Sequence, residues 1–443
     1  MENNTFDTIV IGGGISALTA VYALSKLNKK SLIIEPDQLG GALQTKRVDG
    51  FQCELGPSVF VKKGRVLPFL DDLGLSGDII EPSAPRSGKY IWCNDKVCKV
   101  PTDPFSFFLT PLIPDFDKMM LLRVLKALFS NKVLRPQVDD ESVAQFCSKI
   151  FGRRTIERLI DAALKGIYGG DVDLLSARSL FPGLWQALLD GKDLRGYFKI
   201  RAASPRGGIF VLKHGAQSII EALKIKIDKV DIVKAKAETV SYSEGEFSVL
   251  AGGATYKTKE LFIATSGKAT APFLKNLNPH LSHSLSKLNY TALAVVHCGV
   301  SSDIALKKNA FGVLFPKGMP DSLLGVMYNS ELFPQKAPQG QHLLTLCFGG
   351  ASKQEIVSAD VEYWEKAALT ALSDKLAIDT ARVLCVTKHL YAIPQFEVGH
   401  FKLVSEMRNC EDAFKGLHFI GADCGGIAVP DRITEALNTV DNL

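Results

Sequence analysis

A glycine-rich turn near the start of the chain constrains its fold more than any other feature. The apolar run at residues 9–11 suits a strand that is buried on both faces of a parallel sheet, and residues 18–27 have helix-compatible apolar spacing. Residues 31–34 form a second apolar run. The order strand, glycine turn, helix, strand predicts that an α/β fold begins here with a Rossmann-like nucleotide-binding unit.

The residues of the turn fit a pyrophosphate. Gly12 permits the tight turn, Gly14 lets the backbone approach the phosphates, and Ala17 allows close packing of helix and strand. The helix N-terminus offers unpaired N–H groups to the anion. Glu35 follows Gly14 by 21 residues and can accept hydrogen bonds from a ribose diol, whereas it would repel a 2′-phosphate. The spacing favours FAD or NAD over NADP, and a glycine turn without a ligand is the competing interpretation.

Length and charge limit the class of protein. The chain has 443 residues, too many for one ordinary core and enough for two or three. Hydrophobic residues make up 46% and charged residues 22%, which indicates a globular protein. The net charge of +5 is too small and too dispersed to indicate a nucleic acid partner, but it is compatible with anionic substrates or an anionic membrane surface.

The nine cysteines are scattered with no C-x-x-C pair, and the eight histidines show no metal-binding spacing, so we expect neither disulfides nor a metal site. The N-terminal residues lack a charged-then-apolar leader, and no apolar run reaches the roughly 18 residues that span a bilayer. We therefore expect a cytoplasmic protein that is soluble or peripheral on the cytoplasmic membrane.

Residues 105–113 and 119–129 form an apolar stretch that admits two interpretations. It can be an interfacial element whose apolar side chains enter the headgroup region of an anionic membrane, or an ordinary helix that covers a core. Basic residues within and beside it suit the first interpretation, namely Lys118, Arg123, Lys126 and Lys132.

A cluster of glycines interrupts a mostly helical stretch at residues 142–182. Glycine inside a helix costs about 1 kcal/mol relative to alanine, so the break at residues 166–171 indicates close approach to a ligand or to another backbone. A loop with no ligand is the alternative. Residues 238–265 alternate like a meander that ends in a buried strand, and the last 25 residues return to strand, glycine turn and helix. The chain thus leaves the nucleotide-binding unit twice and returns to it.

Two short motifs after the first turn resemble those of large FAD-containing oxidoreductases related to amine oxidases. Gly40, Gly41 and Thr45 match G-G-x-x-x-T, and Glu54 to Pro57 match E-x-G-P. This resemblance implies FAD, bound in extended form along the sheet.

Taken end to end, the motifs resemble the oxygen-dependent protoporphyrinogen oxidase family. The most specific are G-I-Y-G-G-D at residues 166–171, P-Q-F-x-x-G-H at 394–400 and G-I-A-V-P-D at 426–431. Further matches lie at residues 89–101, 311–314 and 324–330. The family fold implies an FAD-binding domain at residues 1–88, 205–270 and 387–443. It also implies a helical, candidate membrane-associated subdomain at 89–204 and a substrate-binding domain with a mixed sheet at 271–386.

The resemblance implies six-electron oxidation of protoporphyrinogen IX to protoporphyrin IX with dioxygen as acceptor, in haem biosynthesis. Coproporphyrinogen III oxidation on the same fold is the close competitor, and a carotenoid desaturase, an amine oxidase or a non-enzymatic flavoprotein are more distant alternatives. Because flavin carries the chemistry, no catalytic side chain is named. A tetrapyrrole substrate, handover of the product to a ferrochelatase and a homodimer are the partners considered.

Substrate contacts follow from the resemblance. Lys89 stands where many relatives have an arginine that pairs a propionate, and a lysine cannot form the bidentate fork of arginine. Arg86 is expected to share that role, and a solvated hairpin lysine is the alternative for Lys89. The other positions line the macrocycle site in relatives, although by pattern alone the apolar ones are core residues; they are Tyr168, Gly169, Leu314, Met327 and Cys347.

The predicted cofactor contacts combine the turn, the two following motifs, one strand after the first excursion and the C-terminal motif. They are Gly12, Gly14, Ile15, Ser16, Ala17, Glu35, Gly40, Gly41, Thr45, Gly56, Pro57, Ser58, Val59, Ala237, Gly421, Ala422, Ile427 and Val429. His400 matches a motif position, and a structural role is an equal alternative for it.

Overall fold

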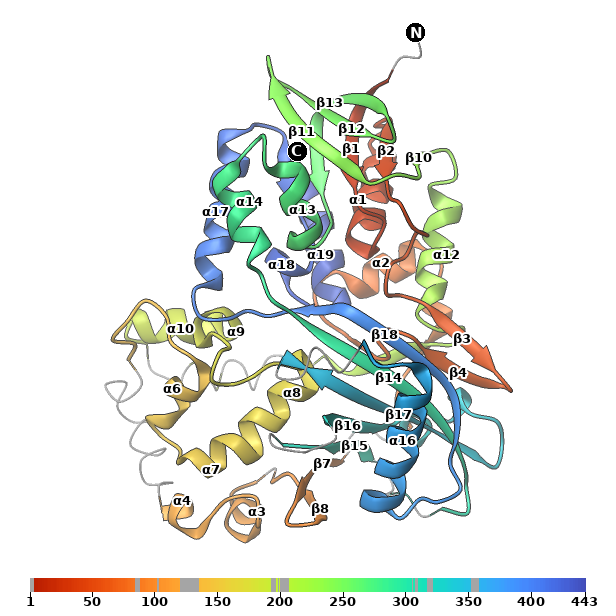
Figure 1. Ribbon diagram of the computed structural model, residues 1–443, viewed down its shortest axis with the longest axis vertical. Helices are drawn as coiled ribbons and strands as arrows, with labels where there is room; N and C mark the ends of the chain where they lie inside the picture. Colours follow the sequence, from red (N-terminus) through yellow and green to blue (C-terminus); the bar gives the residue numbers. More distant parts are fainter. Residues whose placement is uncertain are drawn as a thin grey trace.

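The computed structural model describes residues 4–83, 88–101, 103–119, 135–192, 197, 199, 207–304, 306, 310–316, 322–351 and 358–443. Two sheet-based units are stacked along the long axis of the molecule, and a helical group lies beside the lower one (Figure 1). Arg86 and residues 120–134, on which two of our predictions fall, lie outside the described residues.

The upper unit is built on a seven-stranded sheet, the first sheet, whose central strands are parallel. Its strands run β10 (Asp231–Val233), β2 (Ser31–Ile34), β1 (Thr5–Ile11), β13 (Ala254–Ile263), β12 (Glu246–Ala251) and β11 (Ala237–Ser243), with β19 (Leu417–Phe419) paired to β13. Ile9 pairs with Leu32 on one side and Leu261 on the other. Every residue of β2 is buried, as expected for a strand covered on both faces. The predicted strand–turn–helix–strand unit is confirmed.

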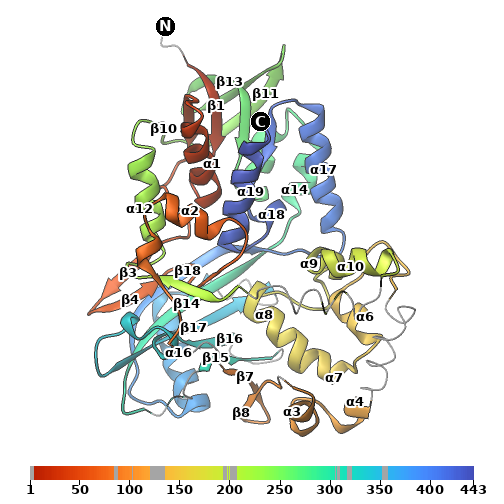
Figure 2. The ribbon, with the colours of Figure 1, turned by 180° about the vertical axis from the view of Figure 1, so that it is seen from behind.

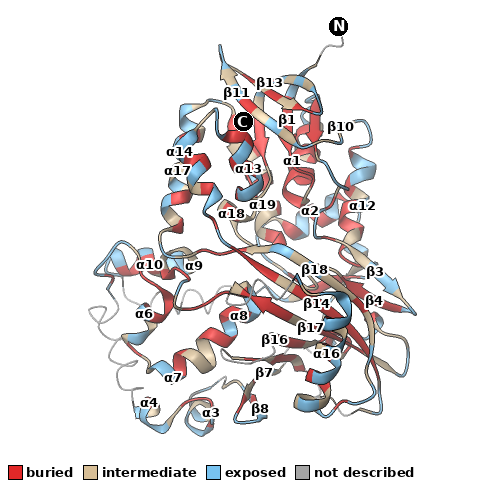
Figure 3. Ribbon diagram, in the orientation of Figure 1, coloured by how far each residue is buried: buried red, intermediate tan, exposed pale blue. Residues whose placement is uncertain are grey.

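Helices cover both faces of the first sheet, and Figure 3 colours most of its central strands as buried. One face packs against α1 (Ile15–Lys26), α2 (Val66–Asp72), α12 (Gln217–Lys226) and α19 (Val429–Asp441). The other packs against α13 (Gly267–Leu274), α14 (Pro279–Ser286) and α17 (His400–Ala413). The short α18 (Ala422–Gly425) precedes α19. The resulting α/β/α layering is that of a nucleotide-binding unit.

The lower unit holds a mixed seven-stranded sheet, the second sheet. Its order is β18 (Arg382–Pro394), β14 (Tyr290–Ser301), β17 (Gln341–Gly350), β16 (Leu323–Tyr328), β15 (Ala310–Leu314), β7 (Gly88–Cys93) and β8 (Lys96–Lys99). Helix α16 (Val361–Leu376) covers one face and buries Trp364 against it. The long strands β14 and β18 cross from the lower unit toward the upper one (Figure 1).

Smaller elements lie between the two sheets or support them. They are the hairpin β3 (Thr45–Val48) and β4 (Phe51–Glu54), the small sheet β5 (Phe60–Val61), β9 (Ile209–Leu212) and β6 (Ile79–Ile80) with η1 (Ser76–Asp78), and the turn elements α15 (Asn329–Leu332) and η3 (Pro334–Lys336).

The helical group faces the second sheet from the side opposite α16 (Figure 2). It contains α6 (Val143–Ser148), α7 (Arg153–Thr155), the π-helical η2 (Ile156–Asp161), α8 (Ala162–Tyr168), α9 (Ala177–Leu180) and α10 (Pro182–Leu189), and α3 (Pro104–Leu109) and α4 (Asp115–Met119) lie at the lower end. Trp185, Phe146 and Leu188 belong to its own core. Ser176 caps α9 by accepting from the Ser179 amide at 2.8 Å, as its position before the helix predicts.

Two features differ from the sequence-based picture. The helical break begins at Gly169 and not at Gly166, because Gly166 lies inside α8, where Leu314 occupies the space that a side chain would need. The predicted domain boundaries near residues 89 and 387 fall inside β7 and β18. The β7–β8 hairpin pairs in parallel with β15 and so extends the second sheet rather than the helical group.

Candidate functional site

The predicted pyrophosphate turn is tight where the backbone packs and open where a ligand would lie. Gly12 has φ +113°, and a Cβ there would stand 3.0 Å from the carbonyl oxygen of Ala264. Gly14 is the N-cap residue of α1, and a Cβ added there would have no atom within 4 Å. The Gly40 amide donates to the Gly13 carbonyl at 2.8 Å, which joins the second glycine motif to the first. The N-terminus of α1 is thus free to bind an anion.

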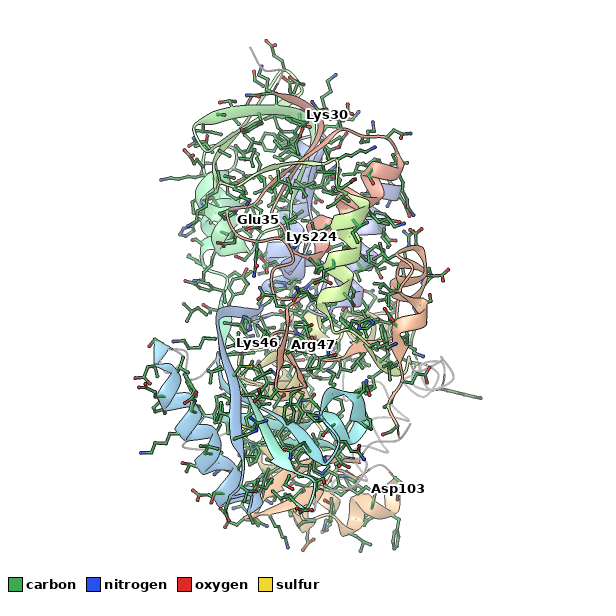
Figure 4. The ribbon with its side chains drawn as sticks, turned by 90° about the vertical axis from the view of Figure 1, so that its right-hand side faces the viewer. Lys30, Glu35, Lys46, Arg47, Asp103 and Lys224 are labelled. Atoms are coloured by element: carbon green, nitrogen blue, oxygen red, sulfur yellow. The ribbon has the colours of Figure 1, made fainter. Side chains whose placement is uncertain are left out.

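Glu35 follows β2 at the edge of this turn, in the upper unit of the side view in Figure 4. Its Oε1 accepts from the Asp37 amide at 3.0 Å, and a Cβ on Gly13 would lie 2.6 Å from its Cγ. Val233 of β10 accepts from the Glu35 amide at 3.0 Å. The carboxylate is therefore fixed beside the glycine turn, where a ribose diol would reach it.

The E-x-G-P segment is joined to the nucleotide unit through the carboxylate of Glu54, which is 3% exposed. Its Oε2 accepts from Thr45 Oγ1 at 2.7 Å and from the Ala216 amide at 3.1 Å, while Oε1 accepts from Gln52 Nε2 at 3.0 Å. Gly56 lies so close that a Cβ would stand 2.1 Å from the Ala42 carbonyl oxygen. The two glycine motifs and the segment that contains Pro57, Ser58 and Val59 therefore form one tightly packed surface.

A buried polar chain, which the sequence analysis did not single out, joins this surface to the second sheet. His297 of β14 contacts the Glu54 carbonyl oxygen through Nε2 at 3.0 Å and Thr345 Oγ1 through Nδ1 at 2.8 Å. Because a carbonyl only accepts, Nε2 carries the proton and Nδ1 accepts from Thr345. Asn329 Nδ2 donates to the same Thr345 oxygen at 2.6 Å. Buried polar groups so arranged fix one geometry between the units.

Acid should destabilise the protein through His297. Burial lowers the pKa of this ring, 1% exposed, to about 4 from its ordinary 6.5. As pH falls, the unfolded chain therefore takes up a proton on His297 before the folded chain does. The contribution of neutral His297 to the free energy of unfolding is complete above about pH 6.5 and is lost as the pH approaches about 4. This loss amounts to about 3 kcal/mol. The free energy of unfolding, measured in urea across this range, should fall accordingly.

The matched variant His297→Gln should be less stable near neutral pH but should show a shallower loss below it, while exposed His283→Gln should follow the wild type. An unchanged pH slope in His297→Gln would contradict this assignment. His400, 8% exposed, titrates in the same direction, because burial lowers its pKa to about 4, and it remains in both variants.

The register of the second sheet brings four predicted substrate residues onto one face, the inner face, opposite α16. Lys89, Gly312, Met327, Thr345 and His297 are successive cross-strand partners. The neighbouring row on the same face runs through Ile91, Leu314, Gly325, Cys347 and Val295. Leu314, Met327 and Cys347 are half-buried, whereas their sequence neighbours on the α16 face are buried. Lys89 is exposed at the β7 end of its row.

Helix α8 packs over this inner face through its glycines. A Cβ on Gly166 would lie 2.6 Å from the Leu314 side chain, and one on Gly169 would lie 3.2 Å from Thr291. Gly169 has φ +62° and ends the helix. Tyr168 is turned toward Phe396, with the ring centroids 6.2 Å apart, and Gln395 Nε2 donates to its carbonyl oxygen at 3.0 Å. Tyr168 and Gly169 therefore lie where α8 meets β14 and the chain after β18.

The C-terminal motif forms a second turn at the edge of the first sheet. The Gly421 amide donates to Glu435 Oε2 at 2.8 Å, and a Cβ on Gly425 would collide with that carboxylate at 1.9 Å. Ala422 begins α18, Ile427 lies in the link after it, and Val429 begins α19. Asp423, 6% exposed, accepts from Tyr290 Oη at 2.7 Å and so ties this turn to β14. Burial raises the pKa of Asp423.

Three residues that the sequence analysis singled out lie away from the nucleotide turn and the inner face, or have a structural explanation. Ala237 opens β11 and pairs with Ala251, two strands away from β13. Lys89 has its side chain exposed rather than enclosed. His400 stacks on Phe396 with the ring centroids 4.2 Å apart, and its Nδ1 makes no hydrogen bond to any described residue, which favours a packing role.

The residues present fit FAD. An added Cβ on Gly14 would meet no atom within 4 Å, and one on Gly41 would lie 3.5 Å from the Gly14 Cα. The backbone amides of this turn therefore suit a pyrophosphate, and the fixed Glu35 carboxylate beside them can accept hydrogen bonds from a ribose diol. Within the described ranges, no group of three or more His, Cys, Asp or Glu side chains could hold a metal ion. The fold and this site together define an FAD-dependent oxidoreductase.

The chain belongs to the flavin containing amine oxidoreductase family, whose model matches residues 15–443. Among curated proteins, it is 26% identical to the coproporphyrinogen III oxidase of Bacillus subtilis (strain 168), over 100% of this chain and 98% of the relative. It is 28% identical to the chloroplastic protoporphyrinogen oxidase 1 of Arabidopsis thaliana, over 98% and 87%. These matches confirm the expected FAD-containing, amine-oxidase-like class.

Solved structures show the same fold. A crystal structure from Exiguobacterium sp. 255-15 superposes with a TM-score of 0.82 at 20% identity and covers 100% of this chain and 99% of the other. Cyclohexylamine oxidase from Brevibacterium oxydans IH-35A gives 0.72 at 15% identity, covering 99% and 98%. The two-unit architecture is therefore that of the amine oxidase fold.

Proposed function

We propose that this chain oxidises protoporphyrinogen IX to protoporphyrin IX, using FAD and dioxygen. The observation that carries the proposal is the inner face: one row joins the exposed Lys89 to Met327, and the next places Leu314 and Cys347 beside it. A half-buried apolar surface with a cation at one end suits a flat macrocycle whose carboxylates lie at its edge. The relatives named after porphyrinogen oxidation support the same choice.

In this mechanism, bound FAD would accept hydride from the macrocycle. Met327 holds the ring against the sheet, while Leu314 borders the ring and packs under Gly166 of α8. Lys89 attracts a propionate and sets the ring's orientation. Ser58 Oγ lies 3.7 Å from Met327 Sδ, so the E-x-G-P segment and the inner face meet directly.

Coproporphyrinogen III is the second candidate substrate, and the Bacillus subtilis relative favours it. Four carboxylates would call for more cations than the inner face presents among its described residues, where Lys89 stands alone at the edge of the two rows. Turnover of the two porphyrinogens, followed by porphyrin fluorescence, tests the choice. A clear preference for coproporphyrinogen would reverse it.

We also propose that the lower end of the molecule binds an anionic membrane. Helices α3 and α4 expose several large apolar side chains, with Phe105 and Phe116 each 75% exposed, Met119 73%, Leu109 67% and Phe108 48%. Figure 2 places both helices together at that end. Lys118 lies among them and forms an ion pair with Asp115 at 2.7 Å. Exposed aromatic side chains of this kind favour the headgroup region. Among the residues described, no helix combines the length and apolar character needed to cross a bilayer.

Replacing both Phe105 and Phe116 with serine should lower binding to vesicles that contain anionic lipid by about tenfold or more, since each ring loses about 1 kcal/mol or more of interfacial transfer. Flotation of the full chain with such vesicles measures this. The control is Ile225→Ser with Leu390→Ser, which removes exposed apolar residues elsewhere (74% and 57% exposed). Equal flotation of the two double variants would count against this surface.

These proposals locate the protein in the cytoplasm at the membrane surface. A ferrochelatase that receives the insoluble product is the proposed partner in handover, and a homodimer is the proposed assembly. Transfer of porphyrin between the two purified enzymes tests the handover, and sedimentation of the purified protein tests the homodimer.

A further inference from the structure

Lys336 is a buried lysine whose main contact is a backbone carbonyl. It closes the short η3 turn, is 1% exposed and sends Nζ to within 3.0 Å of the Ser58 carbonyl oxygen. Its other polar neighbour, Glu54 Oε1, lies farther away at 3.8 Å. Burial lowers the pKa of Lys336, and the Glu54 carboxylate opposes that shift. Nothing in the mechanism above uses this lysine.

Glu54 has partners enough without it. Its two oxygens already accept from Thr45, Ala216 and Gln52. Burying a lysine beside a carboxylate that is already satisfied costs desolvation and returns little stability, since hydrophobic replacements of such pairs are often neutral or stabilising. The ion pair therefore does not explain why Lys336 is buried. The contact between its Nζ and the Ser58 carbonyl oxygen offers another explanation.

The geometry of the peptide that follows Ser58 gives that contact a direction. The described residues contain no cis peptide bond, and in a trans peptide the C=O and the next N–H point in opposite directions. With the Ser58 oxygen held toward buried Lys336, the Val59 N–H points away from the interior. It makes no hydrogen bond to any described residue. Ser58 Oγ meanwhile contacts Met327 Sδ of the inner face, so this peptide lies where the nucleotide unit meets the inner face.

We infer that Lys336 is a positioning residue for the flavin: it fixes the Ser58–Val59 peptide so that the Val59 N–H faces the cofactor, and its charge favours the reduced flavin. This inference rests on the proposed FAD-dependent function. A positive charge behind this peptide would stabilise the extra electrons of a reduced flavin bound in front of it, because a buried site screens charge poorly. Lys336 acts through the backbone and touches neither substrate nor the reacting carbon.

The test is the two-electron midpoint potential of the bound flavin, measured against reference dyes without porphyrinogen. Lys336→Met should shift the ratio of oxidised to reduced flavin at a fixed potential about tenfold toward oxidised, which corresponds to about 30 mV for a two-electron couple. Its dissociation constant for FAD should rise about tenfold. Lys336→Gln keeps a hydrogen-bond donor without the charge. It should lower the midpoint potential of the flavin as Lys336→Met does, but it should retain more of the affinity for FAD.

Two controls separate this role from a structural one. Lys388→Met removes a lysine that also donates to a carbonyl, that of Ala359 at 2.9 Å, on the exposed surface, and it should leave the potential unchanged. The double variant Glu54→Gln, Lys336→Met removes both buried charges and, compared with Glu54→Gln alone, repeats the test where Lys336→Met folds poorly. An unaltered potential in the flavin-loaded Lys336 variants overturns the inference alone. Wild-type protein that purifies without flavin overturns the proposed function with it.

Discussion

Replacing Gly14 with valine is expected to release FAD while leaving the apoprotein as stable as the wild type. The residue has extended backbone angles, φ −77° and ψ −177°, which any residue adopts, and an added Cβ would meet no atom within 4 Å. The larger side chain would therefore be accommodated by the protein and would compete with the pyrophosphate that we expect this turn to bind. We expect the dissociation constant for FAD to rise about 100-fold or more, about 3 kcal/mol.

The flavin absorbance of the purified protein and the FAD titration of the apoprotein measure this effect. The matched control is Gly77→Val, since an added Cβ there also meets no atom within 4 Å, but it lies in η1 away from the nucleotide turn. Both apoproteins should unfold near the wild-type midpoint. Retention of FAD by the Gly14 variant would remove this turn from the cofactor site.

Replacing Met327 with aspartate should abolish most turnover while the flavin stays bound. Met327 is half-buried in the middle of the inner face and contacts Ser58 Oγ, so a carboxylate there would meet the apolar face of the substrate and repel its propionates. We expect kcat/KM to fall about 1000-fold, about 4 kcal/mol of transition-state stabilisation. Met327→Leu, which conserves volume, should cost less than tenfold.

Porphyrin fluorescence gives the rates, and the flavin spectrum reports whether the site remains assembled. Leu390→Asp places the same charge on the exposed part of β18 and should leave kcat/KM near the wild-type value. Near-normal turnover by Met327→Asp would mean that the macrocycle binds elsewhere than on the inner face.

The nucleotide unit was predictable because its information is local. The apolar runs, the glycines and Glu35 lie within 35 residues, and Gly12 meets a steric demand that the structure displays, with φ +113°. The turn of the β7–β8 hairpin is equally local, since Asn94 and Asp95 both adopt the left-handed angles that a two-residue turn requires, φ 52° and 56°.

The remainder depends on pairings between distant parts of the chain. Nothing in the pattern of residues 89–100 says that β7 pairs with β15 more than 200 residues later, so the hairpin was assigned to the helical subdomain. The buried chain of His297, Thr345 and Asn329 joins elements that the sequence separates, and each residue alone has an ordinary strand or turn context. Lys336 likewise has no signature until Ser58 is placed beside it.

The long pair β14 and β18 determines how far apart the two parts of the site lie. The two strands, 12 and 13 residues long, are hydrogen-bonded along most of their length and span about 40 Å. Tyr290 at one end of β14 is bonded to Asp423 of the nucleotide unit. The paired strands therefore connect the nucleotide unit directly to the second sheet. The separation between the nucleotide turn and the inner face is therefore set by the length of these two strands.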